Sequence, residues 1–506
     1  MKQLDYYLNR ITLYRLVLYG LLFIVFVAVL FGFTGTLQLG GGRLAIGALT
    51  LLVACIAANY GFSKLFGAAT NVESAPVTAL ILFCLFLPPK DATGVAMLAA
   101  TGVLAMASKY IVAYKARHIF NPAAFAAVAV GLLGLAHGAW WIANDVMLPF
   151  VAIVGLLILR KSRRFLLFLS FLVPAALLTI LFGLGDGRTT ATLITDTFMS
   201  WPLLFLGTIM LTEPLTSPTT TRSRMVYGVF VGMLVGIGGR LHVGSVHLTP
   251  EMALVLGNLY AYTTVLRQRL RLKLISRQEL GPGIVGFRFA SNQPFRFKPG
   301  QYMDVTLPLA RLDSRGNRRS FSIASSPGEG DVLFGIRIMQ PSSAFKTALS
   351  QLKPGHSVYG VQVAGDFLLP AKQSVKMAWI AGGIGITPFR SMLQHIIDTN
   401  QQRDIVLFYQ VSDPDQAVFK DVLDQAANHG VQVVYVLAGS SKQPPKNWHG
   451  EAGFITSEML AKYVPDAATR RFYISGPPAM VDSYRSMLNS NGIRRSRIIT
   501  DHFSGY

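Results

Sequence analysis

Hydrophobic runs of membrane length follow one another almost without a break up to about residue 266, and they stop near residue 270. An apolar stretch of about 20 residues is long enough to cross the roughly 30 Å hydrocarbon core of a bilayer as a helix. The composition agrees, because 52% of the residues are hydrophobic and only 14% are charged. The sequence therefore predicts a helical membrane domain over residues 1–270, followed by a part that folds in water.

We expect about ten membrane-spanning helices in the first part. Several of the apolar runs are shorter than about 20 residues, so their ends are approximate. The first run is too long for the core of a signal peptide, and we expect it to be retained as a span. The expected ranges are 11–33, 43–62, 73–88, 92–108, 119–136, 145–160, 165–184, 195–213, 225–239 and 249–266.

The Lys and Arg residues between these runs predict an orientation. With the N-terminus inside, the inner segments hold 16 of these cations and the outer segments hold four, Arg43, Lys90, Arg188 and Arg240. Cytoplasmic loops carry such an excess of cations. We therefore expect a multi-pass protein of the cell (inner) membrane, whose even number of spans leaves the C-terminal part in the cytoplasm.

Composition excludes several functional classes. The net charge is +21, but 21 of the 46 Lys and Arg residues lie at or before Lys273, most of them in short loops between apolar runs. Such cations set membrane orientation, so we expect no nucleic-acid partner. Cys55 and Cys84 are too few for an iron–sulfur cluster, which takes about four thiolates, and we expect no metal site. Stacked haems need paired histidines within spans. The histidines of the membrane part lie at span ends or in loops: His118, His137, His242 and His247.

Two segments interrupt the apolar runs. Residues 120–124 (Phe-Asn-Pro-Ala-Ala) open the fifth run, and residues 212–220 (Thr-Glu-Pro-Leu-Thr-Ser-Pro-Thr-Thr) end the eighth. Irregular polar backbone at membrane depth is tolerated where it is buried or lines a site. Such interruptions in both halves of a membrane domain suggest a ligand or cofactor held between broken helices. A Pro-kinked packing joint is the alternative.

The part that follows the basic segment 267–273 contains two further patterns. Short β-rich runs separated by Gly and Pro turns predict an antiparallel β-barrel over residues 271–370. Strands then alternate with helical stretches, which predicts a doubly wound α/β domain over residues 371–506. The expected fold class is thus a multi-span α-helical membrane domain fused to a β-barrel and an α/β domain.

The barrel contains the motif Arg319-Ser320-Phe321-Ser322. Alternation along a strand puts Arg319 and Phe321 on one face. A guanidinium can pair with a pyrophosphate, an aromatic ring can lie on a flavin, and the Ser322 hydroxyl can reach the flavin nitrogen that accepts hydride. Tyr302 precedes the motif in the segment 299–302 (Pro-Gly-Gln-Tyr) and strengthens it.

Ser343 lies in the segment 342–346, which could open a short helix whose amides hold phosphate. An ordinary helix cap is the other interpretation of Ser343.

A glycine-rich loop follows the first strand of the α/β domain and opens a helix. It holds Gly382, Gly383, Gly385, Thr387 and Pro388. The glycines let the backbone approach a diphosphate, which also interacts with the positive end of the helix. The strand–loop–helix context makes the loop a candidate dinucleotide site.

A later strand of the same domain ends in Ser475, Gly476 and Pro477. We expect these three residues to form the second wall of a nicotinamide pocket.

With these three motifs in this order, residues 274–506 resemble the ferredoxin–NADP reductase family. The resemblance implies FAD in the barrel and NADH or NADPH in the α/β domain. It assigns the FAD pyrophosphate to Arg319, the isoalloxazine to Phe321 and Ser322, the dinucleotide to Gly383 and Thr387, and a place beside the nicotinamide to Ser475.

Some features depart from that family or extend the resemblance to it. Phe321 stands where the family more often has Tyr, and Ser475 where it frequently has Cys. The C-terminal segment 501–506 resembles family endings in which an aromatic residue covers the flavin, with Phe503 as the first candidate and Tyr506 as the second. We thus expect Ser322, Ser475 and Phe503 to be the catalytic residues. Carboxylates at 413 and 415 favour NADH over NADPH.

The membrane part resembles the B subunit of the sodium-pumping NADH:quinone reductase and the D subunit of the Rnf electron-transport complex, through residues 73–78, 119–124 and 213–220. The resemblance implies a second flavin, FMN or riboflavin, within the membrane domain, with Asn121, Glu213 and Thr216 as candidate contacts. A Thr in an outward loop carries covalent FMN in that family. The corresponding residue here is Thr192, although Thr190 replaces a glycine.

Together these features predict a membrane-bound oxidoreductase that passes electrons from cytoplasmic NAD(P)H through FAD and a membrane flavin. The expected partners are the lipid membrane and a quinone, an extracytoplasmic acceptor or a flavinylated partner protein. Two alternatives remain open: a one-sided NAD(P)H:quinone reductase, or a transporter-like membrane domain with a redox-sensing flavin domain.

Overall fold

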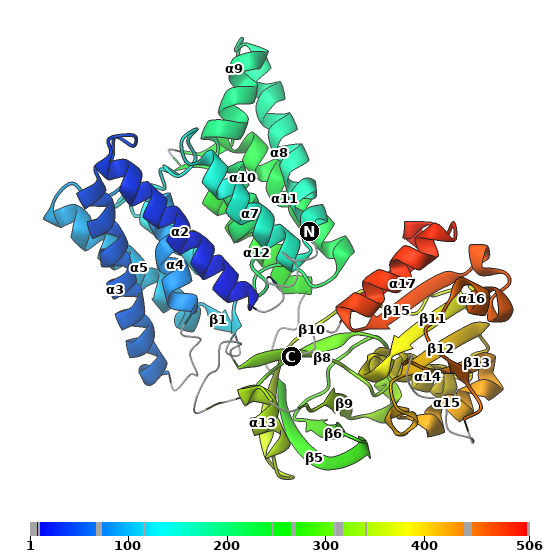
Figure 1. Cartoon of the computed structure of the whole chain (residues 1–506). Coiled ribbons are helices and arrows are strands. Elements are labelled where there is room, and N and C mark those ends of the chain that lie inside the picture. Colours follow the sequence, from blue (N-terminus) through cyan, green and yellow to red (C-terminus); the bar gives the residue numbers. More distant parts are fainter. Residues whose placement is uncertain are drawn as a thin grey trace. The chain divides into compact units, whose positions relative to one another are not determined.

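The computed structural model of the chain describes residues 8, 11–66, 73–114, 117–244, 246–264, 270–307, 309, 317–339, 342–439 and 448–502 (Figure 1). The chain separates into two compact units, Met1–Arg269 and Leu270–Tyr506. The division coincides with the change from membrane-length apolar runs to short strands.

The first unit is helical, and each of the ten expected ranges contains helical residues. It also contains two short hairpins, β1–β2 (Ala113–Tyr114, Arg117–His118) and β3–β4 (His242–Val243, Val246–His247). Its described α-helices are α2 (Leu13–Phe33), α3 (Gly41–Leu65), α4 (Ser74–Leu85), α5 (Ala92–Ile111), α6 (Pro122–Leu132), α7 (Leu148–Ser162), α8 (Phe165–Gly185), α9 (Thr190–Thr195), α10 (Leu203–Phe205), α11 (Thr221–Ile237) and α12 (Pro250–Thr264).

Among the described residues, four helices are long and apolar enough to cross a membrane: α2, α3, α5 and α8. A pair bent by 44°, Thr190–Met199 with Leu203–Met210, would make a fifth span. The expectation of about ten spans is not confirmed. The physical reason is length, since α4 with 12 residues and α6 with 11 rise only about 1.5 Å per residue and fall well short of a roughly 30 Å core.

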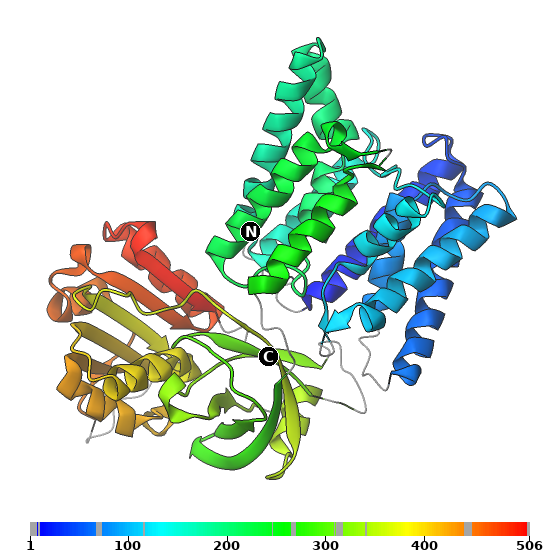
Figure 2. The ribbon, with the colours of Figure 1, turned by 180° about the vertical axis from the view of Figure 1, so that it is seen from behind.

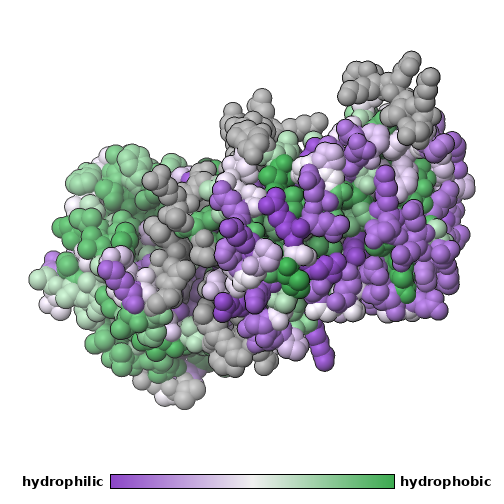
Figure 3. Space-filling model, turned by 90° about the horizontal axis from the view of Figure 1, so that it is seen from below, coloured by the Kyte–Doolittle hydropathy of each residue, from purple (hydrophilic) through white to green (hydrophobic). Residues whose placement is uncertain are grey.

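The surface of the helical unit is apolar where a soluble protein would be polar. Large hydrophobic side chains on the long helices are exposed, among them Phe26 of α2, Leu49 of α3 and Val173 of α8. Figure 3 shows hydrophobic residues gathered over one part of the surface and hydrophilic residues over the other. An exposed apolar surface of this kind is typical of a face that contacts lipid or another protein.

The second unit begins with a six-stranded sheet in which every neighbouring pair is antiparallel, in the order β8-β7-β10-β5-β6-β9. Its strands curl around a common interior (Figure 1, Figure 2). The amide of Ala324, just after β8, donates to the carbonyl of Leu333 in β9 (2.8 Å), which draws the two ends of the sheet together. The strands are β5 (Leu270–Gly281), β6 (Ile284–Ser291), β7 (Tyr302–Thr306), β8 (Arg318–Ser322), β9 (Val332–Arg337) and β10 (Ser357–Ala364).

A parallel sheet follows, in the order β14-β13-β12-β11-β15-β16. The chain starts at β11 in the middle, builds outward through β12 and β13, and returns to β15 on the other side. The elements are β11 (Met377–Gly382), α14 (Thr387–Asp398), β12 (Ile405–Val411), α15 (Lys420–Ala426), β13 (Val431–Leu437), β14 (Glu451–Ala452), α16 (Ser457–Tyr463), β15 (Arg471–Gly476), α17 (Pro478–Ser490) and β16 (Ile498–His502).

Helices cover both faces of this sheet. Trp379 of β11 packs with Phe389 of α14 on one face, whereas Ile380 packs with the α17 residue Leu488 on the other. All six residues of β11 are buried, as expected for a central parallel strand. The doubly wound α/β domain predicted from the sequence is therefore present.

Candidate functional site

The flavin motif lies on β8. Arg319 and Phe321 share one face of the strand, as alternation predicts, and both contact the ring of Phe345 in the short helix α13 (Ala344–Ser350). The guanidinium carbon of Arg319 lies 5.3 Å from the centre of that ring, and the centre of the Phe321 ring lies 5.8 Å from it. The aromatic contact orients the Arg319 side chain on the same face of the strand as Phe321.

The serines of the motif occupy the other face of β8. Ser320 donates to Asp304 of β7 at 2.5 Å, and Ser322 is buried opposite Tyr302 in the β7–β8 register. The Ser343 hydroxyl accepts the amide of Lys346 (3.3 Å) and caps α13. This contact is the ordinary helix-cap interpretation of Ser343.

The glycine-rich loop joins β11 to α14 as the sequence predicts. Gly382 ends the strand, Gly383 has a φ of +51°, and Pro388 occupies the first turn of α14, where its missing amide costs nothing. The Thr387 hydroxyl donates to the carbonyl of Ile384 at 3.0 Å, which holds the loop closed on itself.

The loop contacts the end of β15. A Cβ atom on Gly385 would lie 2.4 Å from the carbonyl oxygen of Ser475, so only glycine permits this approach. Ala381 and Ser475 are register partners in the β11–β15 pair. Gly476 and Pro477 follow directly. The predicted dinucleotide loop and the predicted second wall thus meet at the carboxyl edge of the sheet.

This edge is also where the strand order reverses, between β11 and β15. Doubly wound sheets bind ligands at such a reversal, outside the carboxyl ends of the strands. The Ser475 hydroxyl is fully buried there and has no hydrogen-bond partner among the residues that the structure describes. A buried hydroxyl left in this state is costly, so it fits a ligand that supplies the missing partner.

In the helical unit the structure brings together Asn121, Glu213 and Thr216, the three predicted contacts of a second cofactor. Asn121 Nδ2 donates to Glu213 Oε2 (2.8 Å), and the Thr216 hydroxyl donates to the same oxygen (3.0 Å). The Asn121 side-chain oxygen caps α6 by accepting the amides of Ala123 and Ala124, at 3.1 Å each. Residues 92 positions apart in sequence therefore share one buried polar cluster.

Asn121 and Glu213 also line a pocket of about 550 Å³, counting the space that is open to its surroundings. Helices α4 and α6 both begin at its wall, so their positive ends face it. The lining combines polar and apolar residues: Leu13, Tyr14, Val17, Ser74, Val77, Thr78, Ile81, Asn121, Pro122, Ala123, Ile158, Ile209, Thr212, Glu213 and Pro214.

Sequence reasoning missed the residues that support this cluster. Asn258 of α12 is fully buried, accepts the Asn121 amide at 2.8 Å and donates to the Thr216 carbonyl at 3.0 Å. Arg164 donates to the Thr212 carbonyl at 2.8 Å and to Ser217 at 2.5 Å. The available signal was an Asn inside an apolar run, because such residues face the interior of a helix bundle.

The loop expected around Thr192 is a helix in the structure, whereas flavin attachment at Thr192 stays a prediction. The stretch expected to be an outward loop forms the helix α9, in which Thr192 is exposed. The Thr189 hydroxyl caps this helix and lies 2.8 Å from the Thr192 hydroxyl. Three threonines in place of a glycine-containing loop allow the helical turn, because each can cap or continue a helix. Phe503 and Tyr506 lie outside the described residues.

Comparison with known proteins agrees with the C-terminal assignment. Residues 379–486 match the family model described as the oxidoreductase NAD-binding domain. The chain is 27% identical over 231 residues to the phenol hydroxylase P5 protein of Acinetobacter pittii, which covers 46% of the chain and 64% of that protein. It is 31% identical over 204 residues to the F subunit of the Na⁺-translocating NADH-quinone reductase of Marinomonas sp., covering 37% and 49%.

Among solved structures, a ferredoxin NADP⁺ reductase from Neisseria gonorrhoeae aligns with a TM-score of 0.40 at 20% identity, covering 47% of the chain and 99% of that structure. The chain spans less than two thirds of the length of these two curated relatives. Residues 379–486 thus form an oxidoreductase NAD-binding domain, and the C-terminal half is an NAD(P)H-dependent oxidoreductase module.

Proposed function

We propose that the chain is a membrane-bound flavoprotein oxidoreductase. It takes hydride from cytoplasmic NADH or NADPH through FAD and passes electrons through a flavin in the helical unit to a quinone or an extracytoplasmic acceptor. The observation that carries this proposal is the pairing of two sites in one chain. One is the glycine loop and Ser475 at the strand-order reversal, and the other is the Asn121–Glu213 pocket between broken helices.

The residues of the barrel fit FAD. Arg319 would hold the pyrophosphate with its guanidinium, Phe321 would lie against the isoalloxazine, and Ser322 would hydrogen-bond its reacting edge. Tyr302, the register partner of Ser322 on the neighbouring strand, would contact the flavin on the Ser322 side. A flavin accepts two electrons as hydride and releases them singly, which suits a link between NAD(P)H and a membrane carrier.

The residues of the α/β domain fit a dinucleotide. Nothing lies within 4 Å of a Cβ position on Gly383, which leaves room for the diphosphate at the start of α14, and the Ser475 hydroxyl would bond the nicotinamide end. Asp413 caps a short turn after β12 by accepting the Asp415 amide (2.9 Å). Carboxylates at the end of this strand would repel a 2′-phosphate, which favours NADH.

The chemistry of the pocket lining in the helical unit suits the ring of a second flavin, FMN or riboflavin. An isoalloxazine has an apolar end and an end rich in hydrogen-bonding groups. The pocket matches both, with Val77, Ile81 and Ile209 on its apolar part and Asn121 and Glu213 on its polar part. The similarity to one component of a quinone reductase supports a quinone as acceptor.

The direct test is to purify the full chain in detergent, release its flavins and count FAD, FMN and riboflavin per chain. The proposal predicts one FAD and at least one further flavin. An Asn121→Ala, Glu213→Gln double variant should lose the further flavin and keep FAD. FAD alone in the parent protein would contradict the membrane flavin.

A one-sided NAD(P)H:quinone reductase is the second candidate, favoured by the mixed apolar and polar lining of the same pocket. A quinone head also has a polar edge and an apolar body. Vesicles with the reductase outside and a membrane-impermeant dye trapped inside distinguish the two candidates. Dye reduction on addition of NADH requires electrons to cross the membrane, whereas quinone reduction without dye reduction supports the one-sided enzyme.

A further inference from the structure

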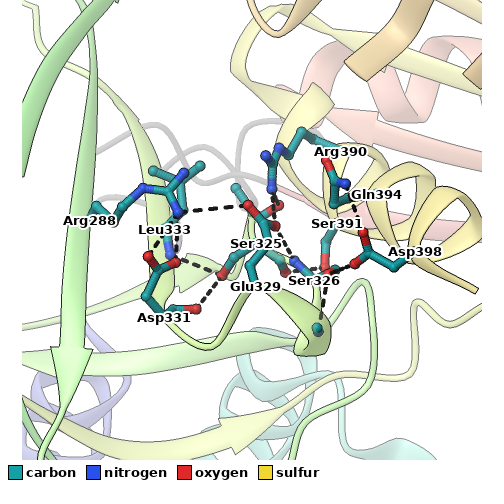
Figure 4. Close-up of polar contacts among 12 residues, drawn as sticks. Arg288, Ser325, Ser326, Glu329, Asp331, Leu333, Arg390, Ser391, Gln394 and Asp398 are labelled. Carbon is teal, nitrogen blue, oxygen red and sulfur yellow. Dashed lines mark hydrogen bonds and ion pairs between the residues drawn. The ribbon is translucent and has the colours of Figure 1, made fainter. Parts of the chain in front are cut away.

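The loop between β8 and β9, residues 323–331, is bonded to helix α14, which follows the glycine-rich loop (Figure 4). Arg390 of α14 donates through Nη1 to the carbonyl of Ala324 (3.1 Å) and to the carboxylate of Glu329. Ala324 lies two residues after Ser322, and Arg390 lies three residues after Thr387. One guanidinium therefore connects the ends of the two predicted cofactor motifs.

Two serine contacts run parallel to this connection. Ser391 donates to the carbonyl of Ser325 at 2.7 Å, and the Ser326 hydroxyl donates to Asp398 at the end of α14. Ser325 and Ser391 are fully buried. The Ser325 hydroxyl donates to the Asp331 carbonyl (2.9 Å) and accepts the Leu333 amide (3.0 Å), which connects Ser325 to β9. The loop is thus held from both the barrel and the α/β domain.

Glu329 lies between two guanidinium groups. Its carboxylate pairs with Arg390 on one side and lies 3.7 Å from Arg288 of β6 on the other, while Arg288 also pairs with Asp331 at 2.8 Å. Glu329 accepts the amide of Ser326 (2.7 Å), which fixes its position in the loop. The Arg390 and Glu329 side chains are only 8% and 16% exposed.

A buried ion pair of this kind contributes little net stability, because desolvation offsets much of the attraction. Its better-attested effect is to specify one arrangement of the packed parts. Here the pair fixes how α14, which follows the glycine-rich loop, packs against the loop that follows β8. Hydride transfer requires the donor and acceptor atoms to be held about 3–3.5 Å apart, and a displacement of about 1 Å can cost about 100-fold in rate.

We propose that Arg390 and Glu329 are positioning residues for hydride transfer. They hold the glycine-rich loop at a fixed position relative to β8, the strand that carries the predicted flavin motif. The inference rests on the proposed function. It assigns a role to residues that neither cofactor motif contains and that contact each other across the barrel and the α/β domain. Cofactor affinity comes from Arg319 and the glycine loop, so loss of the connection should affect the rate rather than the binding.

The experiment compares full-length Arg390→Met, Arg390→Lys and Glu329→Gln with the parent in detergent. Rapid mixing with NADH measures the limiting rate of flavin reduction at saturation, FAD content is measured per chain, and the affinity for ADP-ribose reports dinucleotide binding. We expect Arg390→Met to reduce flavin about 10–100-fold more slowly, with FAD content and ADP-ribose affinity within twofold of the parent. Arg390→Lys should recover part of the rate.

Arg470→Met is the matched control. Arg470 is also buried, with an 8% exposed side chain, and pairs with Asp404 at 2.5 Å, but at the amino-terminal edge of the sheet. It should destabilise the protein without slowing flavin reduction. The proposal is overturned if Arg390→Met reduces flavin within twofold of the parent rate, or if it slows no more than Arg470→Met.

Glu329→Gln preserves the size of the side chain and keeps the test valid if Arg390→Met does not fold. It should slow flavin reduction by at least about fivefold, and it overturns the proposal if it does not. A parent protein that NADH does not reduce at all would instead contradict the proposed function.

Discussion

Arg319 is the residue on which FAD binding is expected to depend most. Its guanidinium is positioned against Phe345 on the face of β8 that also carries Phe321. We expect Arg319→Ala to lose FAD and all NAD(P)H oxidation, because no other group of the motif can pair with a pyrophosphate. Measurement of flavin content after purification checks this. Membrane insertion should be unaffected, and retained activity would contradict the assignment.

Arg319→Lys is the informative partner variant. A lysine keeps the charge and loses the planar two-pronged donor that matches a phosphate group. It should retain a reduced FAD content, with weaker affinity than the parent. Equal retention by Lys and Arg would show that charge alone holds the cofactor.

Asp466 predicts a pH effect on stability. The side-chain hydrogen bond from Arg470 (2.6 Å), together with Lys376 (3.0 Å), holds the pKa of Asp466 below its ordinary value. A carboxyl group whose pKa is lower in the folded state stabilises the protein at pH values above its unfolded-state pKa of about 3.9. This stabilisation is lost as the pH falls through the folded-state pKa. Asp466→Asn should therefore reduce the free energy of unfolding at pH 7 by up to about 1 kcal/mol and lower the Tm accordingly.

The difference in Tm between Asp466→Asn and the parent should narrow as the pH falls below about 4. Asp424→Asn serves as a comparison, because Asp424 is exposed on α15 of the same domain and is not part of this ion pair. A Tm difference for Asp466→Asn that stays constant down to pH 3 would rule out the ion pair as its source.

At the residue scale, the sequence predicted which side chains share a face and failed to predict what they contact. Alternation placed Arg319 with Phe321 because that rule is local. Phe345, which both side chains contact, lies beyond the next strand, and no local pattern identifies it. The same holds for Asn258, which meets Asn121 across 137 positions of sequence.

At the scale of elements, the junction between the glycine loop and β15 depends on Gly385. The Ser475 carbonyl oxygen leaves no room for a Cβ atom there, whereas nothing lies within 4 Å of a Cβ atom on Gly383. We expect Gly385→Ala to cost about 1–3 kcal/mol through overpacking and to abolish NADH-driven flavin reduction. FAD content and reduction by dithionite should survive, because the barrel is untouched.

Gly383→Ala is the control for backbone strain. Its φ of +51° makes a side chain unfavourable by about 1 kcal/mol, without the clash of Gly385→Ala. It should therefore unfold at a higher temperature than Gly385→Ala. The reverse order would show that conformational strain, and not the contact with β15, dominates this loop.

Element positions were predicted better than element lengths. The strand–loop–helix pattern placed β11, the glycine loop and α14 correctly, because glycine, proline and apolar periodicity act locally. Helix lengths in the helical unit were predicted less well, because the apolar runs around α4 and α6 extend beyond the short helices themselves. Thr192 fell in α9 because a run of threonines permits either a loop or a helix turn.

At the scale of the whole molecule, the proposal requires the oxidoreductase module to face the cytoplasm. The 16-to-4 distribution of cations predicts this, and the segment around α4 tests it. Lys64 at the end of α3 and Lys90 after α4 are both exposed and flank a helix of only 12 residues. At about 1.5 Å per residue that helix is roughly 18 Å long, too short to settle the crossing by length.

Cysteine labelling can decide the orientation, because Cys55 and Cys84 are both buried and give little background. On intact cells, a membrane-impermeant maleimide should label Lys90→Cys at once and Lys64→Cys only after the membrane is permeabilised. The expectation follows from cations preferring the inner face, which places Lys64 inside and Lys90 outside. Labelling of Lys64→Cys on intact cells would show that the orientation is the reverse of the predicted one. The NAD-binding domain would then lie where no reduced nicotinamide is supplied. Labelling of neither position before permeabilisation would mean that the α4 segment does not cross.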